Sequence, residues 1–139
     1  PEEGSPLSFP LKNDREKAKD FLYDYILAVL ADPEASAGWR QLNMDIGINI
    51  TDLELGFTLH CSSDKVAAAH GYPEKPDAGL ILSSNTFHKL FTGKGNPMME
   101  FAMGKIKTAG DMGAILKIVG FLPQNVKVYQ QFLTDKGLA

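Results

Sequence analysis

The chain has 139 residues, of which 44% are apolar and 22% are charged, a composition typical of globular proteins. This length predicts one domain over residues 1–139 that buries about two-thirds of the surface of the unfolded chain. No run of 18 uncharged apolar residues occurs, which excludes a transmembrane helix, and the net charge of −3 argues against a nucleic-acid partner.

The chain opens with an arm and a helix. Residues 1–13 contain three prolines and show little periodicity, so we expect an N-terminal arm. From Asp14 to Ala31 the apolar side chains recur at the spacing of one helix face: Ala18, Phe21, Leu22, Tyr25 and Val29. Asp14 is the predicted N-cap of this helix, and Asp32-Pro33 is predicted to end it.

The next two segments alternate apolar and polar residues. Even positions from Leu42 to Ile50 are apolar, and after Thr51-Asp52 the odd positions from Leu53 to Cys61 are apolar. This period of two predicts two half-buried antiparallel strands joined by a tight turn. Shorter strands are predicted over residues 64–70 and 78–82.

Capping residues organise the second half of the chain. Ser83 or Ser84 is predicted to cap a helix that runs through Phe91, and Asn96-Pro97 to open another. A fifth strand is expected over residues 105–109, followed by a helix capped by Asp111. Pro123 is predicted to break that helix, leaving a separate C-terminal helix within residues 124–139. Strands followed by helices indicate an α+β fold.

The segment from Phe87 to Leu122 is unusually rich in apolar residues, including four Met and four Phe. Because methionine is flexible and polarizable, clusters of it suit surfaces that adapt to variable apolar shapes. One interpretation is a cavity for an apolar ligand. The alternative is an ordinary hydrophobic core that happens to contain many methionines.

Catalytic and metal sites find little support in the sequence. His60 and Cys61 are neighbours on a predicted strand, so their side chains point to opposite faces and cannot form a catalytic pair locally. The three histidines lack the spacing of a metal site. We therefore expect no catalytic residue, no metal and no cofactor. As the single cysteine, Cys61 excludes an internal disulfide and, with an acidic and polar N-terminal segment, predicts a cytoplasmic protein.

Glu100 is unusual because it lies among apolar neighbours on a short predicted helix. It either faces water or stands at the mouth of a cavity, where it would contact a ligand hydroxyl or select against acidic head groups. A buried carboxylate would need a partner.

Charge is distributed unevenly along the chain. Residues 1–85 carry fourteen acidic and seven basic residues, whereas residues 86–139 carry seven lysines and three acidic residues. This asymmetry fits transient contact of the second half with an anionic membrane surface. Lysines that simply solubilise an apolar half of the chain are the alternative.

A series of motifs in register resembles the sterol carrier protein type 2 family over about residues 14–122. The matching residues are Lys75-Pro76-Asp77, the run Phe87-His88-Lys89-Leu90-Phe91-Thr92-Gly93, Asn96-Pro97, Phe101, Gly104-Lys105-Ile106-Lys107 and Gly110-Asp111. The resemblance implies a five-stranded, mostly antiparallel sheet covered by helices, which together enclose an apolar tunnel. The chain departs from the family at Glu100, where a small apolar residue is usual.

The resemblance also implies a set of ligand-binding residues on the inner face of the sheet and on the helices of the second half. They are Ile46, Ile48, Phe57, Phe87, Leu90, Phe91, Met98, Met99, Phe101, Met103, Ile106, Met112, Ile115, Leu116 and Val119. About half of them are expected to be core residues only. Glu100 is the candidate mouth residue.

The function implied by the resemblance is non-enzymatic binding or transfer of a lipid, such as a sterol, fatty acid, fatty acyl-CoA or phospholipid. One alternative is an accessory domain that presents an acyl chain or another apolar substrate to a partner enzyme. A structural or interaction module with a filled core is a third reading.

Overall fold

The computed structural model describes residues 8–138, so only the last part of the predicted N-terminal arm is seen. Within that part Phe9 is buried, and its backbone N–H donates to Asn85 Oδ1 at 2.8 Å. Residues 8–13 are therefore held against the rest of the protein.

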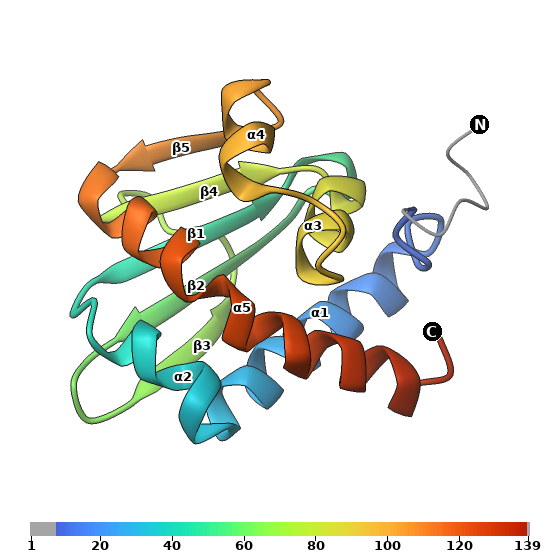
Figure 1. The fold of residues 1–139 in the computed structure, drawn as a ribbon, viewed down its shortest axis with the longest axis horizontal. Helices are drawn as coiled ribbons and strands as arrows, with labels where there is room; N and C mark the ends of the chain where they lie inside the picture. The colour runs from blue at the N-terminus through green and yellow to red at the C-terminus, as the bar shows by residue number, and fades with distance from the viewer. Residues whose placement is uncertain (1–7, 139) are drawn as a thin grey trace.

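Along residues 8–138 two helices come first, then four strands, two helices, a fifth strand and a long last helix (Figure 1). The helices are α1 (Arg15–Ala31), α2 (Pro33–Arg40), α3 (Ser84–Phe91), α4 (Pro97–Ala102) and α5 (Met112–Asp135), with a short 3-10 helix at Thr51–Leu53. The strands are β1 (Asp45–Ile50), β2 (Leu55–Cys61), β3 (Val66–His70), β4 (Ala78–Leu82) and β5 (Ile106–Gly110).

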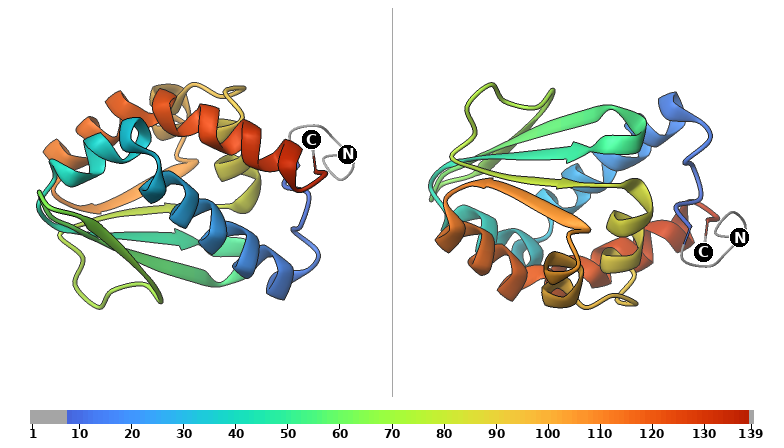
Figure 2. Two further views of the ribbon diagram at one scale, coloured as in Figure 1. Left: turned by 90° about the horizontal axis from the view of Figure 1, so that it is seen from below. Right: turned by 90° about the horizontal axis from the view of Figure 1, so that it is seen from above.

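The five strands form one mixed sheet in the order β3-β2-β1-β4-β5. Three neighbouring pairs are antiparallel, and β1 and β4 are parallel, with Ile48 opposite Leu80. The helices gather on one face of this sheet (Figure 2). The predicted α+β class and the mostly antiparallel five-stranded sheet are thus confirmed.

The two faces of the sheet are built differently. The helix-covered face carries buried apolar side chains such as Ile46, Ile48 and Leu82. The opposite face has glycines at 47, 56 and 79, and a Cβ at any of the three would collide with Tyr72. The missing side chains therefore let Tyr72 lie directly on the central strands.

Capping residues set the helix boundaries as predicted. Asp14 accepts from the backbone N–H of Lys17, Ser83 from that of Thr86, and Asp111 from that of Ala114. Asn96 caps α4 through Met98 and Met99, and Pro97 occupies the first turn. Each side-chain oxygen satisfies an amide that has no partner within its helix.

Helix α2 was not predicted, because Asp32-Pro33 reads as a stop. Asp32 does end α1, but its carboxylate also accepts from the backbone N–H of Ala35 at 2.8 Å and so caps α2. Pro33 fills the first turn of α2, a position where proline costs no hydrogen bond.

The predicted break at Pro123 is wrong, and so is the predicted start of a separate helix at residue 124. Helix α5 continues through Pro123 to Asp135. A proline removes one hydrogen bond, here to the carbonyl four residues earlier, and Pro123 is exposed where water can replace it. Burial of Asn125, Tyr129 and Leu133 holds the following turns in place.

The first two strands are shorter than predicted. β1 begins at Asp45 instead of Leu42, and β2 at Leu55 instead of Leu53. Leu42 and Leu53 are nevertheless buried, so they follow the predicted apolar pattern from positions just outside the strands. The connection is a 3-10 turn in which Glu54 has a left-handed backbone, with φ of 51°.

Candidate functional site: an apolar cavity beneath α4 and α5

An apolar cavity of about 60 Å³ lies between the sheet and the helices. Eight predicted ligand-binding residues line it: Ile48, Phe87, Leu90, Phe91, Phe101, Ile106, Ile115 and Val119. The structure thus gathers residues from β1, α3, α4, β5 and α5 around one space. Their contact with a ligand stays a prediction.

Seven predicted residues lie outside this lining. Ile46 and Phe57 are fully buried in the core, and Phe57 packs against Tyr23 instead. The other five, Met98, Met99, Met103, Met112 and Leu116, are 45–59% exposed at the surface. In the six-residue helix α4, the positions with spacing i, i+3 and i+4 turn inward, and these are Pro97, Glu100 and Phe101.

Twelve lining residues were missed by the sequence analysis, many of them on α1 and α2. They are Tyr25, Ile26, Val29, Leu30, Trp39, Leu59, Leu80, Leu82, Pro97, Ile118, Leu122 and Asn125. For Tyr25 and Val29 a signal was present, since both lie on the predicted apolar face of α1. For Trp39 there was none, because α2 was not predicted.

Aromatic rings form much of the wall. Phe87 and Phe91 are stacked with their centroids 4.3 Å apart, and the edge of Tyr25 meets Phe91 at 5.8 Å. Tyr129 lies behind them, 4.9 Å from Tyr25. Such contacts hold the rings in fixed positions.

The polar atoms next to the cavity are occupied within the protein. Asn125 Oδ1 accepts from Trp39 Nε1 at 3.0 Å, and the Tyr25 hydroxyl donates to the backbone oxygen of Asn125 at 2.8 Å. The Tyr129 hydroxyl is paired with His88 Nδ1 at 2.8 Å. The cavity wall is therefore suited to contacts with apolar groups.

Both phenols remain neutral in this environment. Burial raises the pKa of Tyr25 well above its ordinary value, and the neighbouring Tyr129 adds to the effect. Burial likewise raises the pKa of Tyr129. Neither hydroxyl supplies a negative charge at neutral pH.

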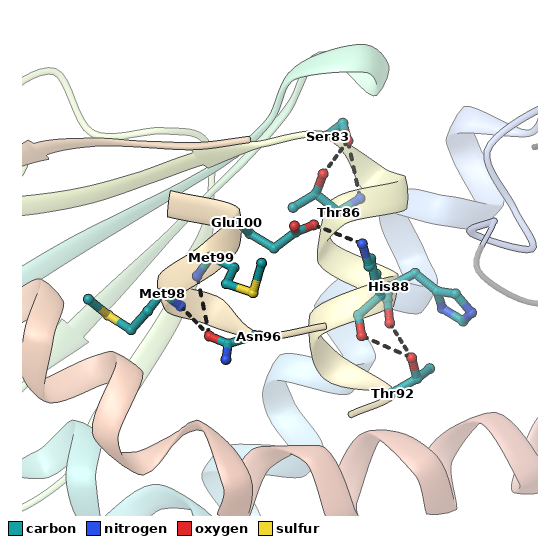
Figure 3. Close-up of polar contacts among 9 residues, drawn as sticks. Ser83, Thr86, His88, Thr92, Asn96, Met98, Met99 and Glu100 are labelled. Carbon is teal, nitrogen blue, oxygen red and sulfur yellow. Dashed lines mark hydrogen bonds and ion pairs between the residues drawn. The ribbon is translucent and has the colours of Figure 1, made fainter. Parts of the chain in front are cut away.

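Glu100 does not face water, and that alternative is wrong. It is 4% exposed, and its Oε1 lies 3.4 Å from Lys89 Nζ. Figure 3 shows the carboxylate directed from α4 toward α3. Glu100 lines a polar surface groove next to the cavity, together with Lys105 and Lys107. The ion pair joins α4 to α3, and a contact of Glu100 with ligand stays a prediction.

Among the ion pairs of residues 8–138, only the pair of Lys89 and Glu100 has a deeply buried partner. Such a pair is weak evidence for net stability, because removing two charges from water is costly. Removing one partner is nevertheless costly, because a buried carboxylate without its partner is strongly unfavourable. In the arrangement seen here the pair ties α4 to α3.

We expect Cys61 to be inert in the native protein. Burial raises the pKa of its thiol to about 12, and the nearby Asp45 adds to the effect. Because the thiolate is the reactive form, native Cys61 should react with a disulfide reagent at pH 8 at least about 100-fold more slowly than the unfolded chain. Equal rates in buffer and in denaturant would contradict this expectation.

Within residues 8–138, no group of three or more His, Cys, Asp or Glu side chains is arranged to hold a metal ion. His60 is paired with Asp45 through a 2.8 Å contact at its Nδ1. In the same described part of the chain, no helix is both long and apolar enough to cross a membrane.

Comparison with known families agrees with this geometry. A model of the SCP-2 sterol transfer family matches residues 24–123. The chain belongs to this family. The matched range contains every candidate ligand-binding residue, together with all five strands.

Two solved structures and one relative place the domain in different contexts. Sterol Carrier Protein 2 from Yarrowia lipolytica, in its apo form, superposes with a TM-score of 0.59 at 24% identity, over 78% of this chain and 91% of that one. The sec-alkylsulfatase Pisa1 from Pseudomonas sp. gives 0.52 at 18% identity, over 60% of this chain and 13% of that one. These likenesses show the fold.

One relative is hydroxysteroid dehydrogenase-like protein 2 from Xenopus laevis, which is 40% identical over 67 residues. Those residues make up 48% of this chain but only 16% of the relative. The chain thus spans a small part of the length of the curated relative that it matches.

Proposed function

We propose that the protein binds an apolar lipid in the cavity and releases it unchanged, as a non-enzymatic lipid carrier. Membership of the SCP-2 sterol transfer family supports apolar lipid binding. The observation that carries the proposal is the cavity itself, whose neighbouring polar groups are all bonded within the protein. Burial of an alkyl chain there would be favourable by about 0.8 kcal/mol for each CH₂.

The cavity must widen to hold such a ligand. Its volume of about 60 Å³ is well below the roughly 300–1,000 Å³ of ordinary ligand pockets. The implied tunnel is therefore part of the proposal: it would form when the cover moves outward.

Helix α4 is the element best suited to move. It is only six residues long, and Gly93 and Gly104 on either side of it have positive φ angles of 81° and 76°. Its inward-facing residues are Pro97, Phe101 and Glu100, which forms the ion pair, and α5 lines the same cavity. Displacing α4 would leave the sheet and the other helices intact.

Solvent extraction of natively purified protein, followed by mass spectrometry, tests the proposal. We expect an apolar lipid in roughly stoichiometric amount, and saturable binding of a fluorescent fatty acid after the lipid is removed. Trp39 lines the cavity and is the single tryptophan, so its emission should change as the probe binds. Protein that yields no lipid and binds no probe would contradict the proposal.

A second candidate is an accessory domain that presents an apolar substrate to an enzyme. The match to 16% of a hydroxysteroid dehydrogenase-like protein favours it. Recovery of an enzyme with the tagged protein, together with weak binding of lipid by the protein alone, would support this second role. The cytoplasmic location inferred from the single cysteine remains a prediction.

A further inference from the structure

Exposed apolar side chains are concentrated at one place in the fold. Six large apolar residues within residues 8–138 are strongly exposed, and five of them belong to α4, the turn after it and the first turns of α5. We call these five the methionine face: Met98, Met99, Met103, Met112 and Leu116. The sixth is Leu27, on α1.

The methionine face adjoins one part of the cavity wall that reaches the surface. Pro97 and Phe101 of α4 and Val119 of α5 line the cavity and are only half-buried. Met98 follows Pro97 directly, and Leu116 lies one turn before Val119 and Gly120. Figure 3 shows Met98 at the start of α4, directed toward α5. A ligand that passes between α4 and α5 would emerge beside these side chains.

The charges around this face are positive. Lys94, Lys105 and Lys117 flank α4 and the start of α5, all three are exposed, and none forms an ion pair with another of residues 8–138. Glu100, the acid of α4, is buried against Lys89, so it does not offset these charges. Asp111 is the remaining acid here, and its carboxylate caps α5.

From these observations we propose that the methionine face docks onto an anionic lipid bilayer, with Lys94, Lys105 and Lys117 contacting lipid phosphates; the proposal rests on the lipid-carrier function. Methionine adapts to the irregular boundary between head groups and acyl chains, and lysine can place its ammonium among head groups while its stem lies on apolar surface. A bilayer is also the natural source and destination of an apolar ligand. Docking in this orientation would place the α4–α5 opening against the membrane.

Flotation of the ligand-free protein with vesicles of phosphatidylcholine that contain about one-third phosphatidylglycerol tests the proposal. We expect the triple variant M98S/M99S/L116S to partition at least about tenfold more weakly than wild type. Leu27→Ser is the control, since it removes the strongly exposed large apolar side chain of α1, and it should partition as wild type does. Circular dichroism establishes that the variants are folded.

The lysines are tested separately. We expect K105Q/K117Q to weaken partitioning and to reduce its dependence on salt, whereas Lys65→Gln, on the β2–β3 turn, should change neither. Wild type that does not float with anionic vesicles, or equal partitioning of the triple variant and wild type, would overturn the proposal. An apolar face that instead retains a protein partner and ignores vesicles would overturn it as well.

This test separates the docking surface from the carrier function. Binding of the fluorescent fatty acid to wild type in solution reports on the cavity alone, and flotation reports on the surface alone. Probe binding without flotation rejects the methionine face as a membrane contact and leaves the carrier function standing. Flotation without probe binding rejects the carrier function.

Discussion

The Val119→Phe variant is expected to bind the fluorescent fatty acid at least about tenfold more weakly than wild type, without loss of stability. Val119 of α5 lines the cavity, as Phe101 of α4 does, and is half-buried. A phenyl ring there would occupy space that the ligand needs. Excluding only two CH₂ groups would cost about 1.6 kcal/mol, which exceeds a factor of ten in the dissociation constant.

A matched substitution on the same helix controls for the added ring. Val128 is also half-buried, but it lies on a surface groove and not on the cavity. Val128→Phe should therefore bind the probe as wild type does. Probe titrations and thermal unfolding of both variants give the comparison. Equal binding by the two variants would show that the ligand does not occupy this cavity.

Local sequence patterns were sufficient for most of the fold. The apolar face of α1, which includes Tyr25 and Val29, depends on residues one or two helical turns apart. The alternation of β1, which includes Ile46 and Ile48, depends on residues one or two positions apart. Caps such as Asp14 act within three residues. Such short-range effects are encoded in adjacent positions, so they can be recognised without knowing the tertiary structure.

The methionines show where composition alone is insufficient. A segment with four Met between Phe87 and Leu122 predicts apolar surface but not which side of it faces inward. Helix α4 is too short for a periodic pattern, and its capping by Asn96 fixes Pro97 and Phe101 toward the cavity. Met98 and Met99 consequently lie on the other side of this helix of about one and a half turns, where they are exposed.

Other parts of the site depend on contacts that no local pattern contains. Pro123 was expected to end a helix, yet buried residues after it keep α5 continuous. Trp39 and Asn125 are 86 positions apart and meet only when α2 packs on α5. Tyr72 covers glycines from three different strands. Residues brought together in this way become visible only in the folded protein.

The largest loss of stability is expected for Asn125→Ala, which should lower the free energy of unfolding by about 2–4 kcal/mol. Asn125 is 1% exposed and accepts the indole N–H of Trp39. Its Nδ2 also lies 3.4 Å from the carbonyl oxygen of Ala35 and 3.3 Å from that of Phe121. Alanine would leave the indole N–H buried without its acceptor and add empty space next to the existing cavity.

An exposed neighbour on the same helix isolates the effect of burial. Gln124 is exposed, so Gln124→Ala should change the free energy of unfolding by less than about 0.5 kcal/mol. Urea denaturation followed by circular dichroism measures both variants. If the free energy of unfolding falls with urea at the same slope in both, their midpoints can be compared directly. If Asn125→Ala were as stable as Gln124→Ala, the hydrogen bond from Trp39 would not be what holds α2 against α5. Since Trp39 and Asn125 both line the cavity, the same bond stabilises the cavity wall and the packing of α2 on α5.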